Sequence, residues 1–399
     1  MKELFVNTQA ERVALARQRY FEEGQLPTGV VSEAVFQSWA RCQRQDHNPR
    51  AKVEFQPVTA SRTQLALQKN RLLHTAWQNE AAELDAVLGS TNCSALLTDP
   101  TGVLIGATCS TRTNERITPI AHRIGVNFSE ELVGTTAPGI VVRTGQIASV
   151  RGAEHFFESV TAMHCAAAPI RDIQGKIAGV LDISSEGIPF NFDAATVVGF
   201  YASSIENRLL IAQSDEHLIV RFQIAPSMLD TPMAGLMGVD MHGNIVWRNA
   251  AASKLLGLAP EKERESPFKV DEVLQLSFAE LASIRAAHAS VMRLPNGLLV
   301  HVRCDLRARD GHRMLMPAAS TKSMAVPTRE TAPEPSRVVV DEPIAVPDGE
   351  GAKPASLRDA DVGLIAKTLK ECGGNVSATA RKLRVSRGLI YRHMQATRT

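Results

Sequence analysis

The segment HCAAAPIRDIQGKIAGVLDIS, residues 164–184, decides the fold of the central part of the chain. Two apolar runs of strand type flank Asp172 and Gly175, which stand three residues apart. That spacing suits a type I turn with Asp at its first position and Gly at its last. The segment therefore predicts an antiparallel hairpin. The same spacing at Asp99–Gly102 and Asp240–Gly243 predicts two more.

Short apolar runs before this hairpin extend the predicted sheet. CSALLTD begins at Cys93, GVLIGAT at Gly102 and QIASVRG at Gln146, and each has the length and composition of a strand. Helical periodicity flanks the sheet on both sides. The predicted helices are residues 9–23, 31–45, 62–88 and 193–222.

The helix predicted at 193–222 has one apolar stripe with mixed three-, four- and seven-residue spacing. The stripe consists of Val198, Tyr201, Ile205, Leu209, Ala212 and Ile219. This spacing fits ordinary packing against the sheet. It fits equally well a dimerising signalling helix that leads from one module into the next.

A second module of strands and helices follows. AGLMGVD and GNIVWRN flank the turn at Asp240, the helical run AAASKLLGL comes next, and paired strands are expected near 291–294 and 298–303. Seven of the twenty prolines then fall within residues 317–354, which indicates an extended linker. The predicted fold class is α+β and multidomain, with two antiparallel-sheet domains before an all-α C-terminal domain. The expected boundaries are 1–60 for an N-terminal helical region, 61–222 for the first sheet domain with its flanking helices, 225–316 for the second, 317–355 for the linker and 356–399 for the C-terminal domain.

The composition of the 399 residues agrees with several folded domains. Hydrophobic residues make up 44% and charged residues 22%, which excludes a wholly disordered or fibrous chain. No run approaches the roughly 18 apolar residues of a membrane span, and the first residues lack the apolar core of a signal peptide. The six cysteines lie far apart without a CxxC pair, so we expect reduced thiols and neither a disulfide framework nor a metal site. We expect a cytoplasmic protein without a cofactor.

The net charge of +2 hides an uneven distribution. Residues 355–399 contain nine lysines and arginines against three acidic residues, so this end carries +6 and the rest of the chain −4. A compact basic end on an acidic body is typical of a nucleic-acid-binding module attached to another function. A solvated basic tail is the alternative on charge alone.

Three short helices are predicted within this basic end. Leu364, Ile365 and Leu369 give the first an apolar face, the second is expected at 376–383, and the third begins after Ser386, a favourable N-cap. This is the order of a helix-turn-helix, whose last helix enters the major groove of duplex DNA. A purely structural helical hairpin is the alternative. The residues expected at the DNA are Arg384, Ser386, Arg387, Gly388, Leu389, Tyr391 and Arg392.

Within this end, GGNVSATARKL and VSRGLIYRHM resemble the Fis-type helix-turn-helix of sigma-54-dependent activators. Arg384 and Thr379 depart from that pattern, which has Gly and Ala at these positions. Residues 93–187 resemble the GAF domain of acetoin-catabolism-type regulators through LTDPTGVLIG, IGVNFSEELVGTTAPGI, GAEHF and the hairpin segment, and SWARC near residue 40 fits the same family. Residues 226–316 resemble a PAS domain through GLMGVDMHGNIVWRNAAASKLLGL.

Members of that family carry an AAA+ ATPase between their sensors and the helix-turn-helix. This sequence contains no G-x-x-x-x-G-K-[ST] phosphate loop, and residues 317–354 are too few for a nucleotide-binding domain. The resemblance therefore implies a regulator that does not remodel sigma-54 polymerase with ATP. It also implies a homodimer on operator DNA, with RNA polymerase or a full-length activator as further candidate partners.

The resemblance to a GAF domain implies a pocket over the sheet for a small-molecule effector. It places residues 133–140 and the segments around 155 and 164 at this pocket. The run GTTAPGI differs from the family's usual GTNA-type run, so the effector is expected to differ from acetoin. The alternative is a structural role, with hydrogen-bonded histidines and a small buried thiol. The candidate contacts are Thr135, Thr136, His155, Phe156, His164 and Cys165.

Two further functions stay open at this point. Some GAF domains resemble a methionine sulfoxide reductase, which needs several thiols at one cavity, so Cys93, Cys109 and Cys165 would have to converge. The chain also suits a partner that pairs with a full-length activator without binding DNA itself. The basic helical end favours the DNA-binding regulator, and we expect no catalytic residues.

Overall fold

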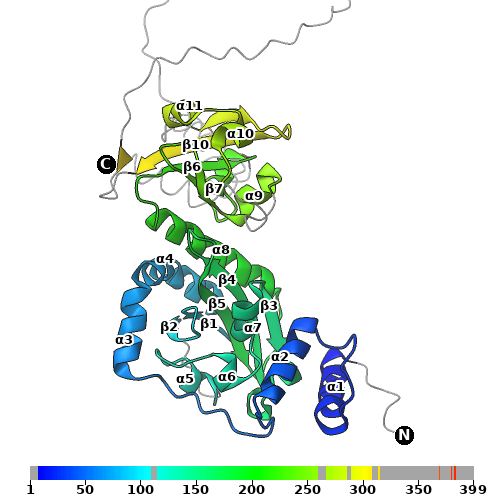
Figure 1. Ribbon diagram of the computed structural model, residues 1–399. Helices are drawn as coiled ribbons and strands as arrows, with labels where there is room; N and C mark the ends of the chain where they lie inside the picture. The colour runs from blue at the N-terminus through cyan, green and yellow to red at the C-terminus, as the bar shows by residue number, and fades with distance from the viewer. Residues whose placement is uncertain are drawn as a thin grey trace, which may run out of the picture. The chain divides into compact units, whose positions relative to one another are not determined.

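The computed structural model describes residues 8–108, 115–258, 267–284, 289–307 and 313–314, together with positions 368, 379 and 382. The chain divides into two compact units, residues 1–323 and 324–399. The first unit contains two antiparallel sheets with helices packed on them (Figure 1). These sheets confirm the predicted α+β class.

The first sheet has five strands in the order β2-β1-β5-β4-β3. Their bounds are β1 Cys93–Thr98, β2 Leu104–Ala107, β3 Ala148–Arg151, β4 Met163–Arg171 and β5 Ile177–Glu186. The central hairpin β4–β5 contains the segment that predicted it. The amide of Gly175 donates to the carbonyl of Asp172 at 2.9 Å, and that of Gly102 to Asp99 at 3.0 Å, so both predicted turns are confirmed.

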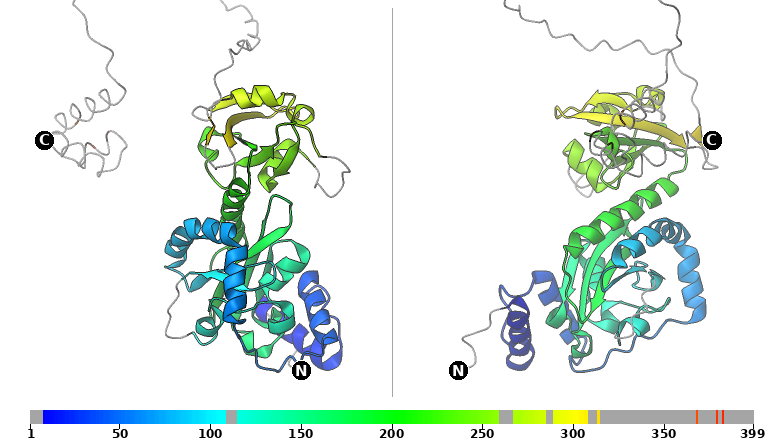
Figure 2. Two further views of the ribbon diagram at one scale, coloured as in Figure 1. Left: turned by 60° about the vertical axis from the view of Figure 1, so that its left-hand side comes forward. Right: turned by 180° about the vertical axis from the view of Figure 1, so that it is seen from behind.

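Side chains of the first sheet alternate between two hydrophobic clusters. Those on one face, including Leu97 and Leu181, pack with α4 and α8. Those on the other face, including Leu96 and Cys165, are covered by three short helices, α5, α6 and α7 (Figure 2). The bounds of these helices are Arg71–Leu88 for α4, Thr118–Ala121 for α5, Glu130–Val133 for α6, Ala137–Thr144 for α7 and Ala194–Ala212 for α8.

The two N-terminal helices, α1 (Gln9–Glu23) and α2 (Glu33–Arg44), form where the sequence predicted helices. Their apolar faces are buried in the same cluster as Leu96, Ile140 and Cys165 of the first-sheet domain. The members that they contribute are Tyr20, Val35, Trp39 and Cys42. The amphipathic helices 9–23 and 33–44 thus complete the core of the first-sheet domain, and the boundary at residue 60 stays a prediction.

Two long predicted helices are wrong in part. The helix predicted at 62–88 is divided into α3 (Ala60–Lys69) and α4, because Asn70 leaves helical geometry with φ −101° and ψ 26°. The helix predicted at 193–222 ends at Ala212, and Leu218–Gln223 form strand β6. Glu216 has φ 59°, and the run LIVRFQ after it is buried on both faces of a sheet. Apolar spacing alone did not separate this buried strand from a helix.

The second sheet has the order β11-β10-β6-β7-β8, with β9 paired to β10. Its strands are β6, β7 Gly235–Val239, β8 Ile245–Arg248, β9 Ser290–Arg293, β10 Leu299–Arg307 and β11 Arg313–Met314, and its helices are α9 Ala250–Leu256, α10 Val270–Leu274 and α11 Phe278–Ser283. The turn between β7 and β8 forms as predicted, with the amide of Gly243 3.0 Å from the carbonyl of Asp240. Because β6 is central, the second domain begins near Leu218, and the boundary predicted between 222 and 225 is wrong.

Side chains at the end of α8 join the two sheets. The indole Nε1 of Trp247 donates to Ser214 Oγ at 2.8 Å, and Asn249 Nδ2 donates to Asn207 Oδ1 at 2.8 Å. Ile173, in the turn of the β4–β5 hairpin, packs against the cluster that contains Trp247. The hairpin at the centre of the first sheet therefore contacts the second domain.

Candidate functional site

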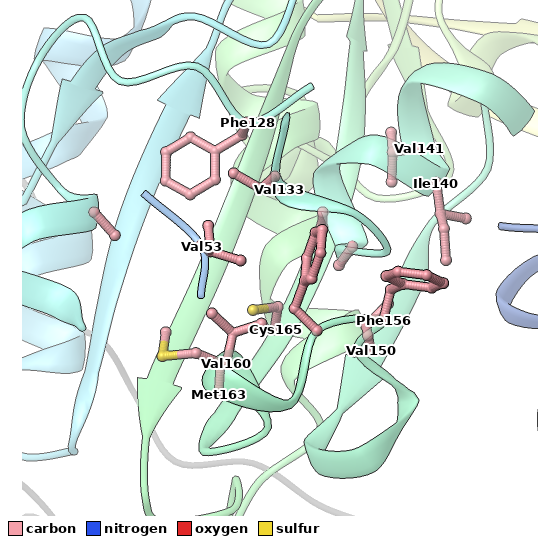
Figure 3. Packing of buried hydrophobic residues seen from close by; sticks show 14 of the residues in the cluster. Val53, Phe128, Val133, Ile140, Val141, Val150, Phe156, Val160, Met163 and Cys165 are labelled. Atoms are coloured by element: carbon pink, nitrogen blue, oxygen red, sulfur yellow. The ribbon is translucent and has the colours of Figure 1, made fainter. Parts of the chain in front are cut away.

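The face of the first sheet under α5, α6 and α7 encloses a cavity of ≈ 30 Å³, which has room for about two water molecules. Figure 3 shows Phe128, Val133, Val160, Met163 and Cys165 gathered in this part of the core. Most of the lining is apolar. Its residues are Phe55, Leu96, Ile117, Ala121, His122, Phe128, Val133, Thr136, Pro138, His155, Val160, Met163, Cys165, Asp182 and Ser184.

The sheet supplies the polar wall of this cavity. Asp182 and Ser184 lie two residues apart on β5 and so share a face, and Cys165 of β4 pairs with Ser184. Ser184 Oγ donates to Asp182 Oδ2, and it lies 3.3 Å from Cys165 Sγ. The thiol lies 3.6 Å from His155 Nε2, while His155 Nδ1 donates to the carbonyl of Gly152 at 3.0 Å. A continuous chain of polar contacts therefore runs along an otherwise apolar wall.

Two polar atoms at this cavity are buried without a hydrogen-bond partner among the described residues, Asp182 Oδ1 and His122 Nε2. Asp182 is 1% exposed, and burial raises the pKa of its carboxyl to about 7. Burial also lowers the pKa of His122 to about 4, so this imidazole is neutral at pH 7. Buried polar atoms without partners are rare in proteins and mark a place where a ligand or water belongs.

The N-terminal helices hold the segments that cover the cavity. The buried guanidinium of Arg17 donates to the carbonyls of His155 and Phe156, the latter at 2.6 Å. Trp39 Nε1 donates to the carbonyl of Glu154 at 2.7 Å. The loop that carries His155 is therefore fixed by side chains of α1 and α2.

A buried ion pair fixes the second covering segment. Glu130, at the start of α6, accepts hydrogen bonds from Arg41 Nε at 2.6 Å and Arg41 Nη2 at 2.8 Å. Ser38 Oγ donates to the same carboxylate at 2.6 Å and lies 2.7 Å from Thr135 Oγ1. A bidentate arginine–carboxylate pair of this kind is geometrically specific. It links α2 to the start of the segment 130–140.

Of the six effector contacts predicted from the sequence, three line the cavity and three lie elsewhere. Thr136, His155 and Cys165 are part of the lining. Thr135 faces Ser38, Phe156 packs among aromatic rings, and His164 lies near Phe190 on the other side of β4. Effector contact by any of them stays a prediction.

The sequence analysis did not select Asp182, Ser184 and His122. Asp182 and Ser184 stand in the run GKIAGVLDIS, which was interpreted only as an apolar strand. The sequence could have predicted them, because these two polar residues interrupt the apolar run and their spacing places them on one face of a strand. His122 carries no such signal, since its position depends on how α5 folds over the sheet.

Of the three thiols that the reductase alternative needs, Cys165 lines this cavity and Cys93 does not. Cys93 belongs to the cluster on the opposite face of the sheet from Cys165, and Cys109 lies outside the described residues. Burial raises the pKa of the Cys165 thiol well above its ordinary value, so the nucleophilic thiolate is disfavoured there. In the part of the chain that the structure describes, no group of three His, Cys, Asp or Glu side chains is placed to hold a metal ion.

The predicted DNA-binding residues, Arg384, Ser386, Arg387, Gly388, Leu389, Tyr391 and Arg392, lie outside the described residues, as does the predicted linker 317–355. Thr368, Thr379 and Lys382 are helical; the two threonines are buried and Lys382 is exposed. The burial of Thr379 agrees with the Fis-type pattern, which has the small residue Ala at the same position. Among the described helices none is long and apolar enough to cross a membrane.

Comparison with known families assigns both ends of the chain. Residues 7–198 match the N-terminal domain of MimR, and residues 356–396 match the Fis family of bacterial regulatory proteins. The chain is therefore similar to MimR in its N-terminal half and to the Fis family of bacterial regulatory proteins at its C-terminal end. The predicted resemblance to acetoin-catabolism-type regulators is confirmed. The first match includes α1 and α2, in agreement with their burial in the first-sheet domain.

Curated relatives of the chain are transcriptional regulators. The acetoin catabolism regulatory protein of Cupriavidus necator is 32% identical over 40% of this chain and 25% of its own length. The acetoin dehydrogenase operon transcriptional activator AcoR of Bacillus subtilis is 28% identical over 51% and 34%, respectively. The propane 2-monooxygenase operon transcriptional activator MimR of Mycolicibacterium smegmatis is 25% identical over 77% and 49%. The matched part is thus between a quarter and a half of each relative's length.

Among solved structures, the Escherichia coli DhaR(N)–DhaL complex contains a chain that aligns with 68% of this one and 99% of its own length. The sequence identity is 14% and the TM-score 0.43.

Proposed function

We propose that the protein senses a small-molecule effector in the cavity of its first-sheet domain, and that occupancy changes how a dimer places its Fis-type helices on duplex DNA. The observation that carries this proposal is the mostly apolar cavity whose lining includes Asp182, a buried residue with a carboxylate oxygen that no described residue satisfies. A mostly apolar cavity with a few convergent polar groups is the usual form of a small-molecule site.

The size of the cavity limits the effector. At ≈ 30 Å³ the free space suits a molecule of a few heavy atoms. The covering helices α5 and α6 have four residues each, so a small displacement of either makes room for a larger molecule. The effector belongs to the class of small, largely apolar metabolites.

The β4–β5 hairpin offers a route by which occupancy reaches the rest of the chain. Cys165, Asp182 and Ser184 line the cavity from these two strands. At the turn of the same hairpin, the amide of Ile173 donates to Gln213 Oε1 at 3.2 Å, and its side chain packs near Trp247 of the second sheet. A shift of the strands at the cavity therefore displaces a contact of the second domain.

Regulation in this proposal acts through occupancy of DNA. The sequence contains no phosphate loop, so nothing in these 399 residues cradles the phosphates of ATP in that way. The dimer either blocks RNA polymerase, recruits it, or pairs with a full-length activator. Promoter output with and without sigma-54 separates these routes.

The test uses a variant with a filled cavity. Ala121 lines the cavity and is 2% exposed, so Ala121→Val occupies the free space. Ala81→Val on α4, partly buried against the opposite cluster, is the matched control. A panel of neutral compounds of three to five heavy atoms is screened for those that raise the unfolding temperature of the wild-type chain.

The proposal predicts compounds that stabilise the wild type and Ala81→Val but not Ala121→Val. The same compounds should change the affinity for a duplex that the full chain has selected from a random library. The proposal is contradicted if no compound stabilises the wild type. It is also contradicted if the compounds stabilise Ala121→Val as much as the wild type.

A further inference from the structure

Two polar atoms of residues that line the cavity have no hydrogen-bond partner among the described residues. The first is the acceptor Asp182 Oδ1, which has no partner, while Oδ2 accepts from Ser184. The second atom is His122 Nε2. Both side chains line the same small cavity.

The hydrogen-bond partner of His122 determines the role of its free nitrogen. Ser94 Oγ lies 3.2 Å from His122 Nδ1. When the serine hydroxyl donates to Nδ1, the hydrogen of the neutral imidazole is at Nε2, which then donates into the cavity. Ser94 is available as that donor, since this contact is the one the structure shows for its hydroxyl.

Strand register places Ser94, the hydrogen-bond partner of His122, diagonally from Asp182. On β5, Ser184 pairs with Ser94 of β1, and Asp182 pairs with Leu96. His122 therefore lies over the strand pair next to that of Asp182, on the same face of the sheet. Diagonal neighbours of this kind, here Ser94 and Asp182, are about 7–8 Å apart at the backbone, and both Asp182 and His122 line the same cavity.

We propose that Asp182 and His122 recognise a hydroxyl group of an uncharged effector, with Asp182 Oδ1 accepting its hydrogen and His122 Nε2 donating to its oxygen. This inference rests on the proposed function of the cavity and assigns the chemical class of its ligand. The apolar remainder of the lining, from Leu96, Val133 and Met163 among others, receives the hydrocarbon part.

Other small polar groups satisfy only half of this arrangement. A carbonyl oxygen accepts from His122 but has no hydrogen for Asp182. An ammonium group donates to Asp182 but leaves His122 N–H unsatisfied, and its remaining hydrogens meet a wall that is mostly carbon. Burial of each unsatisfied group weakens binding. A hydroxyl group is both donor and acceptor, so it satisfies both atoms.

The test compares three probes of equal size, 2-propanol, acetone and 2-propylamine, on the full chain at pH 8. The ε-methyl group of Met163, which lines the cavity, is the reporter. Its NMR signal is assigned by its loss in Met163→Leu. We expect 2-propanol to shift this signal with an affinity at least about tenfold higher than acetone or 2-propylamine.

Two variants of Asp182 complete the experiment. Asp182→Val removes the acceptor and keeps a residue that strands tolerate, so the preference for 2-propanol over acetone should disappear. Asp182→Asn keeps an acceptor oxygen and should retain a weaker preference, which also serves if the valine variant does not fold. Unchanged 2-propanol binding by both variants overturns the proposal.

The three probes also test the hydroxyl assignment separately from the proposal that the cavity binds an effector. A Met163 shift with acetone or 2-propylamine that equals or exceeds that with 2-propanol overturns the hydroxyl assignment and leaves the cavity as a sensor. The absence of any shift overturns the hydroxyl assignment for molecules of this size, and the screen with Ala121→Val then judges the cavity independently.

Discussion

Adjacent glutamates at the start of α6 differ sharply in their surroundings. Glu130 is 3% exposed and accepts hydrogen bonds from Arg41 and Ser38. Glu131 forms an ion pair with Arg143, in which both side chains are about half exposed, 50% and 48%. Exposed pairs contribute little to stability, whereas breaking a buried pair leaves an uncompensated charge.

Glu130→Gln should therefore lower the free energy of unfolding by about 1–2 kcal/mol, because the partly buried Arg41, 26% exposed, loses the counter-charge that it bonds with two donors. Glu131→Gln is the matched control and should change it by less than about 0.5 kcal/mol. Urea unfolding of the two variants measures both values. Equal effects would show that the Arg41–Glu130 pair does not fix the cover of the cavity.

Asp182 predicts a pH dependence of stability. Its carboxyl titrates near pH 7 in the folded chain, because burial raises the pKa from an ordinary value of 3.8. Between these values the folded state holds a proton that the unfolded state has released, so the contribution of Asp182 to stability falls as the pH rises. His155, whose pKa burial lowers to about 4, has the opposite effect, but it is present in the wild type and the variant alike.

Asp182→Asn should thus gain stability relative to the wild type between pH 5 and pH 8, by more than about 1 kcal/mol. Chemical unfolding of both chains across this pH range measures the difference between their free energies of unfolding. The contribution of His155 is the same in both chains and cancels in this difference. Parallel pH profiles would mean that Asp182 is ionised in the folded state at pH 5.

Tryptophan side chains lie against glycines in both sheets. A Cβ atom built on Gly106 would lie 2.6 Å from Trp77 Nε1, and one on Gly238 would lie 2.2 Å from Trp247 Nε1. Gly238 and Trp247 are directly paired across β7 and β8. The absence of a side chain at these positions lets the indole rings pack on the strands, and the indole of Trp247 bonds Ser214 at the end of α8.

Gly238→Ala should lower the free energy of unfolding by about 1–3 kcal/mol, because Trp247 is 2% exposed and has no room to move away. Gly199→Ala, in the interior of α8, is the contrasting variant. Its new methyl group would meet only the end of the flexible, half-exposed Ile147, at 3.0 Å, so helix propensity should raise stability by up to about 1 kcal/mol. Thermal unfolding distinguishes the two. A tolerated Gly238→Ala would contradict the described packing of Trp247.

Turn chemistry made the hairpins predictable, since Asp172, Gly175 and their counterparts specify a local geometry that depends on few distant contacts. The division between α8 and β6 was not predictable from apolar spacing, because Ile219 and Val220 are buried on opposite faces of a sheet that forms only with β7 and β10. For the site, Thr136, His155 and Cys165 came from the family resemblance. Asp182 could have been selected from the polar interruptions of its apolar run, whereas His122 required the fold of α5.

At the scale of the whole molecule, the proposed function assigns affinity for DNA to the basic C-terminal end and specificity to its third predicted helix. Arg387 lies on that predicted helix and Lys367 on the first. Arginine at a recognition helix can bond a base or phosphate with two donors, whereas an outer lysine contributes only to the general field.

Arg387→Ala should cost about 1–3 kcal/mol in binding to a selected duplex, and Lys367→Ala should cost less and act alike on all sequences. A mobility-shift titration at fixed salt measures both. Truncation after Lys353 should remove binding altogether, since it removes the nine cationic residues of this end. Equal losses for the two point variants would contradict the assignment of the third helix.

The central claim is that occupancy of the first-sheet cavity controls DNA binding. Its most direct measurement is the affinity of the full chain for a selected, fluorescent duplex, with and without a saturating compound that stabilises the wild type but not Ala121→Val. The account predicts at least a fivefold change for the wild type, within the usual range of about 5–150-fold for coupled sites, and no change for Ala121→Val. An unchanged affinity of the wild type at saturation would contradict it.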